Sequence, residues 1–188
     1  MKRSSAVALS VVGLVLFTAG CGYNTIQTMD EKVNQAQGQI QTQLQRRADL
    51  IPNLVNTVKG ITKQEDTVFI SIANARAKLS GAVQSGNVPE MAAANAALTQ
   101  GLGRLIAISE NYPQLRSSEN FKQLQDQLEG TENRISVARQ DYNAAVGEYN
   151  AYVRRFPYNL TAKVFGMGKP RDYFEAEKGA TETPKVQF

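Results

Sequence analysis

The sequence predicts an all-α protein, an antiparallel up-and-down bundle of three to four long helices. Gly and Pro are scarce between positions 23 and 156, whereas Ala, Gln, Glu, Leu and Arg, which favour helix, are abundant. Apolar residues in this region recur at steps of three and four, the spacing of one helix face, and strand signals are absent. Such stripes must be buried against one another, which a bundle of long helices joined by short turns achieves.

The first helical stretch is predicted over residues 26–82, with a proline inside it. Pro52 cannot donate a hydrogen bond to the carbonyl of Ala48. We therefore expect either one kinked helix or two nearly collinear helices, the second capped by Asp49, and a break at Pro52 supplies the fourth helix of the bundle. The apolar stripe of the stretch is Ile26, Met29, Val33, Ala36, Ile40, Leu44, Ala48, Ile51, Leu54 or Val55, Val58, Ile61, Val68, Ile72, Ala75 and Leu79.

A loop at residues 84–88 separates this stretch from the next helix. Asn87 or Val88, before Pro89, marks the start of that helix, and residues 111–113 end it. Its apolar stripe is Met91, Ala94, Leu98, Leu102, Leu105, Ile108 and Tyr112. Gly101 and Gly103 weaken the helix but permit a neighbouring helix to approach closely.

The clearest periodicity follows Ser118, a predicted N-cap, and Pro157 ends it. Its steps of three and four alternate without a slip over Phe121, Leu124, Leu128, Thr131, Ile135, Ala138, Tyr142, Ala145, Tyr149, Tyr152 and Phe156. This is a heptad seam. Such a seam can pair with a helix of the same chain or with a helix of a second copy, and in the second case the protein is a homo-oligomer. Beyond it, residues 159–168 are expected to form a short helix that packs Leu160, Val164 and Phe165 on one end of the bundle.

The N-terminus has the pattern of a lipoprotein signal peptide over residues 1–20. Lys2 and Arg3 precede an apolar run at 6–17, which is shorter than the roughly 20 residues that cross a bilayer as a helix. Small residues then lead to Cys21, the expected lipidation site. Residues 21–170 would form a lipid-anchored domain on the extracytoplasmic face of a bacterial membrane, with 171–188 as a mobile tail. The alternative is an uncleaved transmembrane anchor with the same orientation.

Composition argues against catalysis, metal binding and nucleic-acid binding. The chain has no His, and lipid would consume its single Cys, so the common general base, metal ligand and thiol nucleophile are missing. We therefore expect no enzyme activity, catalytic residue, metal or cofactor. Without Lys2 and Arg3, 19 basic residues face 17 acidic ones, and no basic cluster exceeds a pair, which does not fit phosphate-backbone binding.

Two segments resemble the LemA family of bacterial membrane-tethered helical proteins. They are residues 45–55, QRRADLIPNLV, and residues 155–166, RFPYNLTAKVFG, with Tyr23 and Asn24 ahead of them and Tyr173 and Phe174 after them. The resemblance covers roughly residues 23–175. It implies an antiparallel helical bundle preceded by a signal or anchor, and it implies no particular reaction. The Cys21 lipobox departs from the transmembrane anchor that is common in the family.

Three groups of residues are candidate sites. Arg46, Arg47 and Asp49, next to Pro52 and Asn53, can grip a partner's carboxylate or a lipid phosphate, or can form a cap and an ion pair within the helix. The tyrosines of the heptad seam can line a groove or belong to the core. The C-terminal aromatics can dock a partner or cap the bundle: Phe165, Tyr173 and Phe174.

These observations favour a noncatalytic, membrane-anchored scaffold or adaptor of the bacterial cell envelope. Its expected partners are the membrane, through the N-terminal lipid, and an envelope protein. The alternative is a binder of a small apolar or anionic ligand or lipid, held within the bundle near Pro52 or the tyrosine seam.

Overall fold

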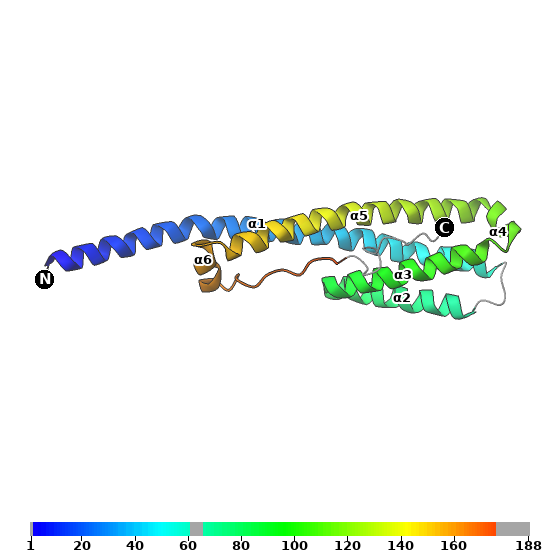
Figure 1. The fold of residues 1–188 in the computed structure, drawn as a ribbon. Coiled ribbons are helices and arrows are strands. Elements are labelled where there is room, and N and C mark those ends of the chain that lie inside the picture. Colours follow the sequence, from blue (N-terminus) through cyan, green and yellow to red (C-terminus); the bar gives the residue numbers. More distant parts are fainter. Residues whose placement is uncertain (1, 61–65, 176–188) are drawn as a thin grey trace, which may run out of the picture. The chain divides into compact units, whose positions relative to one another are not determined.

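The computed structural model describes residues 2–60 and 66–175, with side chains from residue 22 onward. Within these ranges the regular structure is entirely helical, which confirms the all-α prediction (Figure 1). The described part contains six helices, four long and two short: α6 corresponds to the short helix expected at residues 159–168, whereas α4, which begins at Pro113, was not expected. The helices are α1 (Lys2–Lys59), α2 (Asp66–Ser85), α3 (Val88–Ser109), α4 (Pro113–Ser117), α5 (Glu119–Arg154) and α6 (Tyr158–Val164).

The chain divides into two compact units, which are described separately. Unit 1 comprises Met1–Gln37 and Asp141–Asp172, and unit 2 comprises Gly38–Gln140 and Tyr173–Phe188. Both α1 and α5 contribute residues to each unit. The predicted domain of residues 21–170 therefore draws on both units.

In unit 2, α1 continues past Pro52 to Lys59, which agrees with the alternative of one helix. The other alternative, two helices with Asp49 as the cap of the second, is wrong. The carbonyl that Pro52 leaves without a partner in the helix is that of Ala48. Arg76 of α2 donates to it from Nε at 2.8 Å. Because a side chain from the neighbouring helix satisfies this buried acceptor, α1 does not need to restart.

Two substitutions, at Arg76 and at Pro52, test the hydrogen bond between Arg76 and the Ala48 carbonyl. Arg76→Ala leaves the Ala48 carbonyl without its partner, and we expect the free energy of unfolding to fall by about 1–2 kcal/mol. In a Pro52→Ala background the helix regains its own bond to that carbonyl, so the same Arg76→Ala change should cost less. Urea denaturation followed by circular dichroism measures both. Equal losses in the two backgrounds would show that Arg76 acts through another contact.

Helices α2 and α3 form a helical hairpin whose turn matches the predicted loop. Gly86 takes a left-handed φ of +68°, and the Asn87 side chain caps α3 by accepting from the backbone N–H of Glu90 at 3.3 Å. Gly101 permits close packing, since a Cβ there would lie 3.0 Å from Cγ1 of Ile72 on α2. Apart from the adjoining backbone of α3, no heavy atom of the described residues lies within 4 Å of a Cβ placed on Gly103, so only Gly101 has the packing role expected of both.

Helix α5 has the predicted N-cap and, for most of its length, the predicted core face. The Ser118 hydroxyl accepts from the backbone N–H of Phe121 at 3.5 Å. Buried members of the seam are Phe121, Leu128, Thr131, Ile135, Ala138, Tyr142 and Tyr149. Phe156 was expected to continue this face but is 75% exposed, because α5 ends two residues earlier at Arg154.

Helix α6 lies in unit 1 and packs with the opposite face from the one predicted. Thr161 and Ala162 are its buried residues. Leu160 and Val164 are exposed, so the prediction that they pack on the end of the bundle is wrong. The reason is a close approach to α1: a Cβ at Gly22 would meet Cδ1 of Tyr158 at 2.7 Å and Oγ1 of Thr161 at 3.8 Å. Small side chains of α6 fit this contact better than leucine or valine would.

The predicted signal peptide lies in the part of α1 whose side chains are not described, as does the Cys21 lipidation site. Among the described residues, no helix combines the length and the apolar character needed to cross a membrane. Residues 176–188 of the predicted mobile tail lie outside the described residues. Its first residues have defined contacts, since Arg171 is hydrogen-bonded within unit 1 and Phe174 is buried.

Candidate functional site

Arg47, one of the predicted site residues next to Pro52, lies in the interior of unit 2. Arg47 is 3% exposed, and its Nη1 donates to Oδ1 of Asn95 at 2.7 Å and also pairs with Oε2 of Glu132. These partners come from α3 and α5, so one guanidinium on α1 joins three helices. Burial lowers the pKa of Arg47, while the charge and hydrogen bond of Glu132 raise it. Arg47 therefore holds the helices of unit 2 together and is not available to a partner.

The neighbouring Arg46 has the surface position that the motif predicts for a binding residue. It is exposed, as is Asp49, and together they line an open groove of about 540 Å³ between α1 and α2. Gln45 donates from Nε2 to Oδ1 of Asp49 at 2.9 Å. Among the described residues no carboxylate forms an ion pair with Arg46, so the predicted pair with Asp49 is not formed. The other lining residues are Gln41, Thr42, Leu50 and Val83.

Two further residues of the predicted site lie outside this groove. Pro52 is partly buried and Asn53 is exposed, and neither lines the groove. The backbone carbonyl of Asn53 accepts from the Thr57 hydroxyl at 2.9 Å within α1. The predicted site thus separates into a supporting part, Arg47 and Pro52, and a surface part, Arg46 and Asp49.

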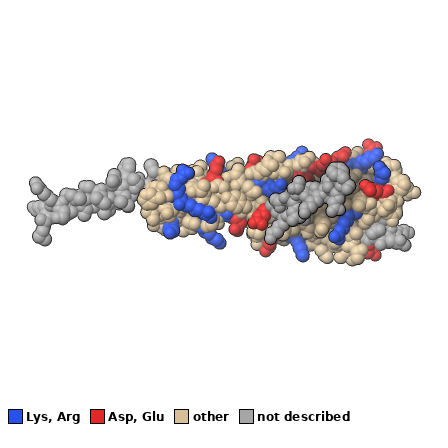
Figure 2. All heavy atoms as spheres, viewed as in Figure 1, with Lys and Arg blue, Asp and Glu red and all other residues tan. Residues whose placement is uncertain are grey.

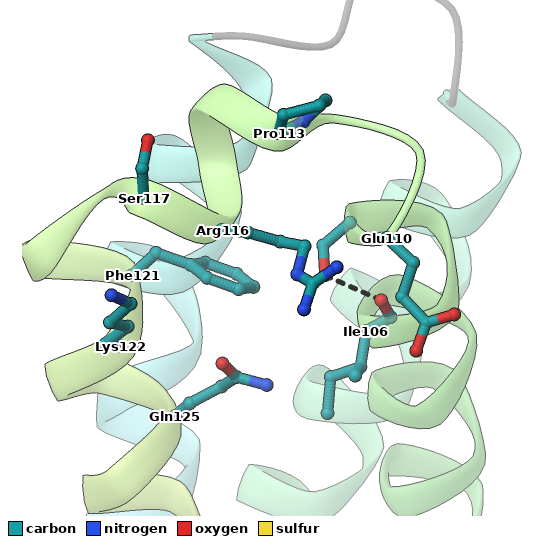
Figure 3. A pocket seen from close by; sticks show the side chains of 9 residues that line it. Ile106, Glu110, Pro113, Arg116, Ser117, Phe121, Lys122 and Gln125 are labelled. Carbon is teal, nitrogen blue, oxygen red and sulfur yellow. Dashed lines mark hydrogen bonds between the residues drawn. The ribbon is translucent and has the colours of Figure 1, made fainter.

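The second cavity of unit 2 was missed from the sequence. It has a volume of about 650 Å³ and lies where α3, α4 and α5 meet. Figure 3 shows the Arg116 side chain between Phe121 on one wall and Ile106 and Glu110 on the other. Ser109, Pro113, Ser117, Lys122 and Gln125 complete the lining. The signal in the sequence was the break before Pro113, which was interpreted only as the end of a helix.

In unit 1, the tyrosine seam holds a segment of the chain itself. The hydroxyl of Tyr142 donates to the carbonyl of Asp172, and that of Tyr149 donates to the carbonyl of Met167, both at 2.8 Å. Arg171 pairs with Asp30 of α1 at 2.6 Å, and this hydrogen bond raises the pKa of Arg171. These two tyrosines therefore fix residues 167–172 along the unit, as expected of core residues whose hydroxyls reach an edge.

The two tyrosines predict a loss of stability at alkaline pH. Burial raises the pKa of Tyr142 and of Tyr149 above the usual 10.0. The folded state therefore holds these protons more tightly than the unfolded state. The resulting contribution to the free energy of unfolding is complete below pH 10 and is lost as pH rises through the folded-state pKa values. Denaturant unfolding measured from pH 9 to 12 should show this fall. It should be smaller in a Tyr142→Phe/Tyr149→Phe variant, and equal falls would contradict the assignment.

The predicted C-terminal aromatic site is divided between the units. Phe165, in unit 1, is 54% exposed and its ring lies 4.6 Å from that of Tyr23. Tyr173 and Phe174 belong to unit 2, where Tyr173 is exposed and Phe174 is buried. Phe174 thus acts as a core residue, while Phe165 and Tyr173 remain at the surface.

Charged side chains do not form a metal-binding cluster in the described residues, where no three carboxylates or other common ligands converge. Over unit 2, the face shown in Figure 2 carries Lys and Arg interspersed with Asp and Glu. This mixed pattern is typical of a solvated protein surface.

The fold and these contacts define a helical-bundle protein with an internal arginine that joins its helices and an arginine-bearing groove at its surface. The sequence model of the LemA family matches residues 36–188, and the chain belongs to this family. That match includes the segment around Pro52 and the segment containing α6, but not Tyr23 and Asn24.

Three relatives are magnetosome proteins by name. Magnetosome protein MamQ 2 and Magnetosome protein MamQ 1 of Paramagnetospirillum magneticum are each 29% identical to this chain, covering 96% of it and 75% of their own length. Magnetosome protein MamQ of Magnetospirillum gryphiswaldense is 28% identical with the same coverage.

Proposed function

We propose that the protein is a noncatalytic adaptor of the bacterial cell envelope, a membrane-tethered bundle with up-and-down antiparallel long helices that binds a protein partner in the groove between α1 and α2. The observation that carries this proposal is the separation of the two adjacent arginines. Arg47 is buried and bonded to Glu132 and Asn95, whereas Arg46 is exposed in the groove and pairs with no carboxylate of the described residues.

The chemistry of the groove suggests what kind of segment it binds. A guanidinium offers a planar pair of donors that matches a carboxylate. Leu50 and Val83 provide apolar surface beside it, and the Gln45 bond to Asp49 reduces the competition of that carboxylate for Arg46. The partner segment would therefore carry an acidic side chain next to an apolar one.

The tether is the lipidated Cys21 or, failing that, an uncleaved N-terminal anchor. Either one places the bundle on the extracytoplasmic face of the membrane. The magnetosome names of the relatives support a role in a cellular assembly, and the absence of His from the sequence supports binding over catalysis.

Cross-linking in living cells, followed by purification and mass spectrometry, tests this function. We expect one dominant envelope protein with the intact chain, lost with Arg46→Ala and kept with Arg134→Ala, which removes an exposed arginine from α5. Cys21→Ala should reduce capture if the lipid is the tether. Capture that survives Arg46→Ala would contradict the groove, and no specific partner in any sample would contradict the adaptor function.

The cavity at α3, α4 and α5 favours a second candidate function, the binding of a small apolar or anionic ligand. Arg116 and Lys122 offer positive charge, and Ile106 and Phe121 offer apolar walls. Native lipid extract should then raise the melting temperature, and Arg116→Ala should remove that rise while Arg104→Ala, at an exposed position of α3, keeps it. No rise with the intact chain would count against this function.

A further inference from the structure

An exposed apolar surface lies on α6 and the turn before it. We call it the α6 face and define it by Phe156, Leu160 and Val164 with the neighbouring basic residues Arg155 and Lys163. The three apolar side chains are 75%, 54% and 79% exposed. Lys163 and Val164 follow Leu160 by three and four residues, so all three side chains lie on one side of the short helix.

Contacts within unit 1 fix this face outward. The ring of Tyr158 stacks on Tyr152 at 4.3 Å and lies over Gly22, while Thr161 and Ala162 are buried. The helix ends in a cap in which the backbone N–H of Met167 donates to the carbonyl of Ala162 at 2.7 Å, with Gly166 at a φ of +74°. Because the inner side of α6 is occupied, Leu160 and Val164 cannot turn inward without breaking these contacts.

The sequence around α6 is basic. Residues 149–171 contain five basic residues and no acidic one. The first acidic residue of the described α1 side chains, Asp30, is paired with Arg171. On the side of the molecule shown in Figure 2, Lys and Arg gather over the end of unit 1 that contains α6, with few Asp or Glu visible. An apolar surface surrounded by basic residues fits an anionic lipid surface, where long cations reach headgroups while apolar side chains enter the boundary.

The α6 face also lies beside the expected point of membrane attachment. Gly22, which contacts Tyr158 and Thr161, directly follows Cys21 in the sequence. The residues of α1 from 22 to 29 carry no charge. Cys21 and α6 thus belong to the same unit. Helix α6 packs against Gly22, the residue that follows Cys21.

We propose that the α6 face binds the surface of an anionic phospholipid bilayer, giving the protein a second membrane contact beyond its N-terminus. This inference rests on the proposed membrane tether. Two attachments would hold unit 1 at a defined orientation on the bilayer, whereas a single N-terminal link leaves its rotation free.

The absence of tryptophan from the chain provides a direct test. Full-length Leu160→Trp protein is reconstituted into phosphatidylglycerol vesicles, and brominated acyl chains serve as the quencher. Val137→Trp is the matched control, because Val137 is 57% exposed on α5 in unit 2. We expect the position-160 emission to shift to shorter wavelength and most of it to be quenched, with little change at position 137. Val164→Trp replaces the reporter if Leu160→Trp fails to fold.

The roles of the lipid charge and of the basic residues are tested in the same Leu160→Trp protein. Exchanging phosphatidylglycerol for phosphatidylcholine should reduce the quenching several-fold, and so should Arg155→Gln with Lys163→Gln in phosphatidylglycerol. Quenching that is independent of lipid charge would overturn the assignment to an anionic surface. A shift to shorter wavelength without quenching would mean that protein covers the face, either a second copy or a partner, and would also overturn it.

Vesicle flotation separates this inference from the proposed tether. If the protein floats with vesicles but position 160 is not quenched, the tether stands and the α6 contact is wrong. If the protein does not float at all, both are wrong.

Discussion

Replacing Glu132 by alanine is expected to lower the free energy of unfolding by about 3 kcal/mol. Its partner Arg47 has a side chain only 4% exposed, so removal of the carboxylate leaves a charged guanidinium in the interior with Asn95 as its remaining acceptor among the described residues. Nε of Arg47 already has no hydrogen-bond partner in the described structure, so the residue has little capacity to compensate. Urea denaturation followed by circular dichroism measures the loss.

Two further variants show whether the loss of stability comes from the unpaired charge of Arg47 or from the removal of any glutamate. Glu129→Ala removes an exposed carboxylate one turn earlier on α5 and should stay within about 0.5 kcal/mol of the unchanged protein. Arg47→Met combined with Glu132→Ala removes both charges, and it should be more stable than Glu132→Ala alone. A double variant less stable than the single one would contradict the view that the unpaired charge causes the loss.

Asn150→Ala is expected to cost about 2 kcal/mol in unit 1. The Asn150 side chain is 5% exposed and pairs twice with the backbone of Arg171: Nδ2 donates to the carbonyl at 2.9 Å, and Oδ1 accepts from the N–H at 2.8 Å. Alanine leaves both backbone groups without these partners. Denaturant unfolding gives the size of the loss, and amide hydrogen exchange at Arg171 should become faster.

Asn133 is the matched control for this substitution, because it is an exposed asparagine on the same helix. Asn133→Ala should leave both the stability and the exchange at Arg171 almost unchanged. If Asn150→Ala lowers stability without faster exchange at Arg171, the residue acts through packing in α5 and not through the segment at 167–172.

The sequence predicted the local features of the fold well. The apolar stripes of α1, α3 and α5 are set by helical periodicity, which is visible in any one segment. The caps at Asn87 and Ser118 depend on hydrogen bonds that span three residues, so they too can be predicted locally. This is why the core and these two caps were foreseen, whereas the end of α1 at Lys59, inside the predicted stretch of residues 26–82, was not.

Contacts between distant segments explain what the sequence left open or did not predict. One continuous helix and a break at Pro52 were both compatible with the sequence, because the carbonyl that Pro52 frees is bound by Arg76, 28 residues away. The different roles of Arg46 and Arg47 depend on Asn95 and Glu132, which lie 48 and 85 residues from Arg47. No local pattern distinguishes two adjacent arginines whose partners are this remote.

Helix α6 illustrates a different limit. Its apolar residues were expected to be buried because they are apolar, but a close approach between Tyr158 and Gly22 selects the small residues Thr161 and Ala162 for the interface. Steric fit decided which face packs, and the larger apolar side chains were left at the surface.

Photo-crosslinking from single positions in living cells shows whether the groove between α1 and α2 binds a protein partner. Thr42 lines the groove and Thr99 lies on α3; both are exposed threonines whose hydroxyls bond to a backbone carbonyl four residues earlier. With a photoreactive residue at position 42 we expect one discrete cross-linked envelope protein, and with one at position 99 we expect none. The same products from both positions, or none from position 42, would mean that this groove does not bind the partner.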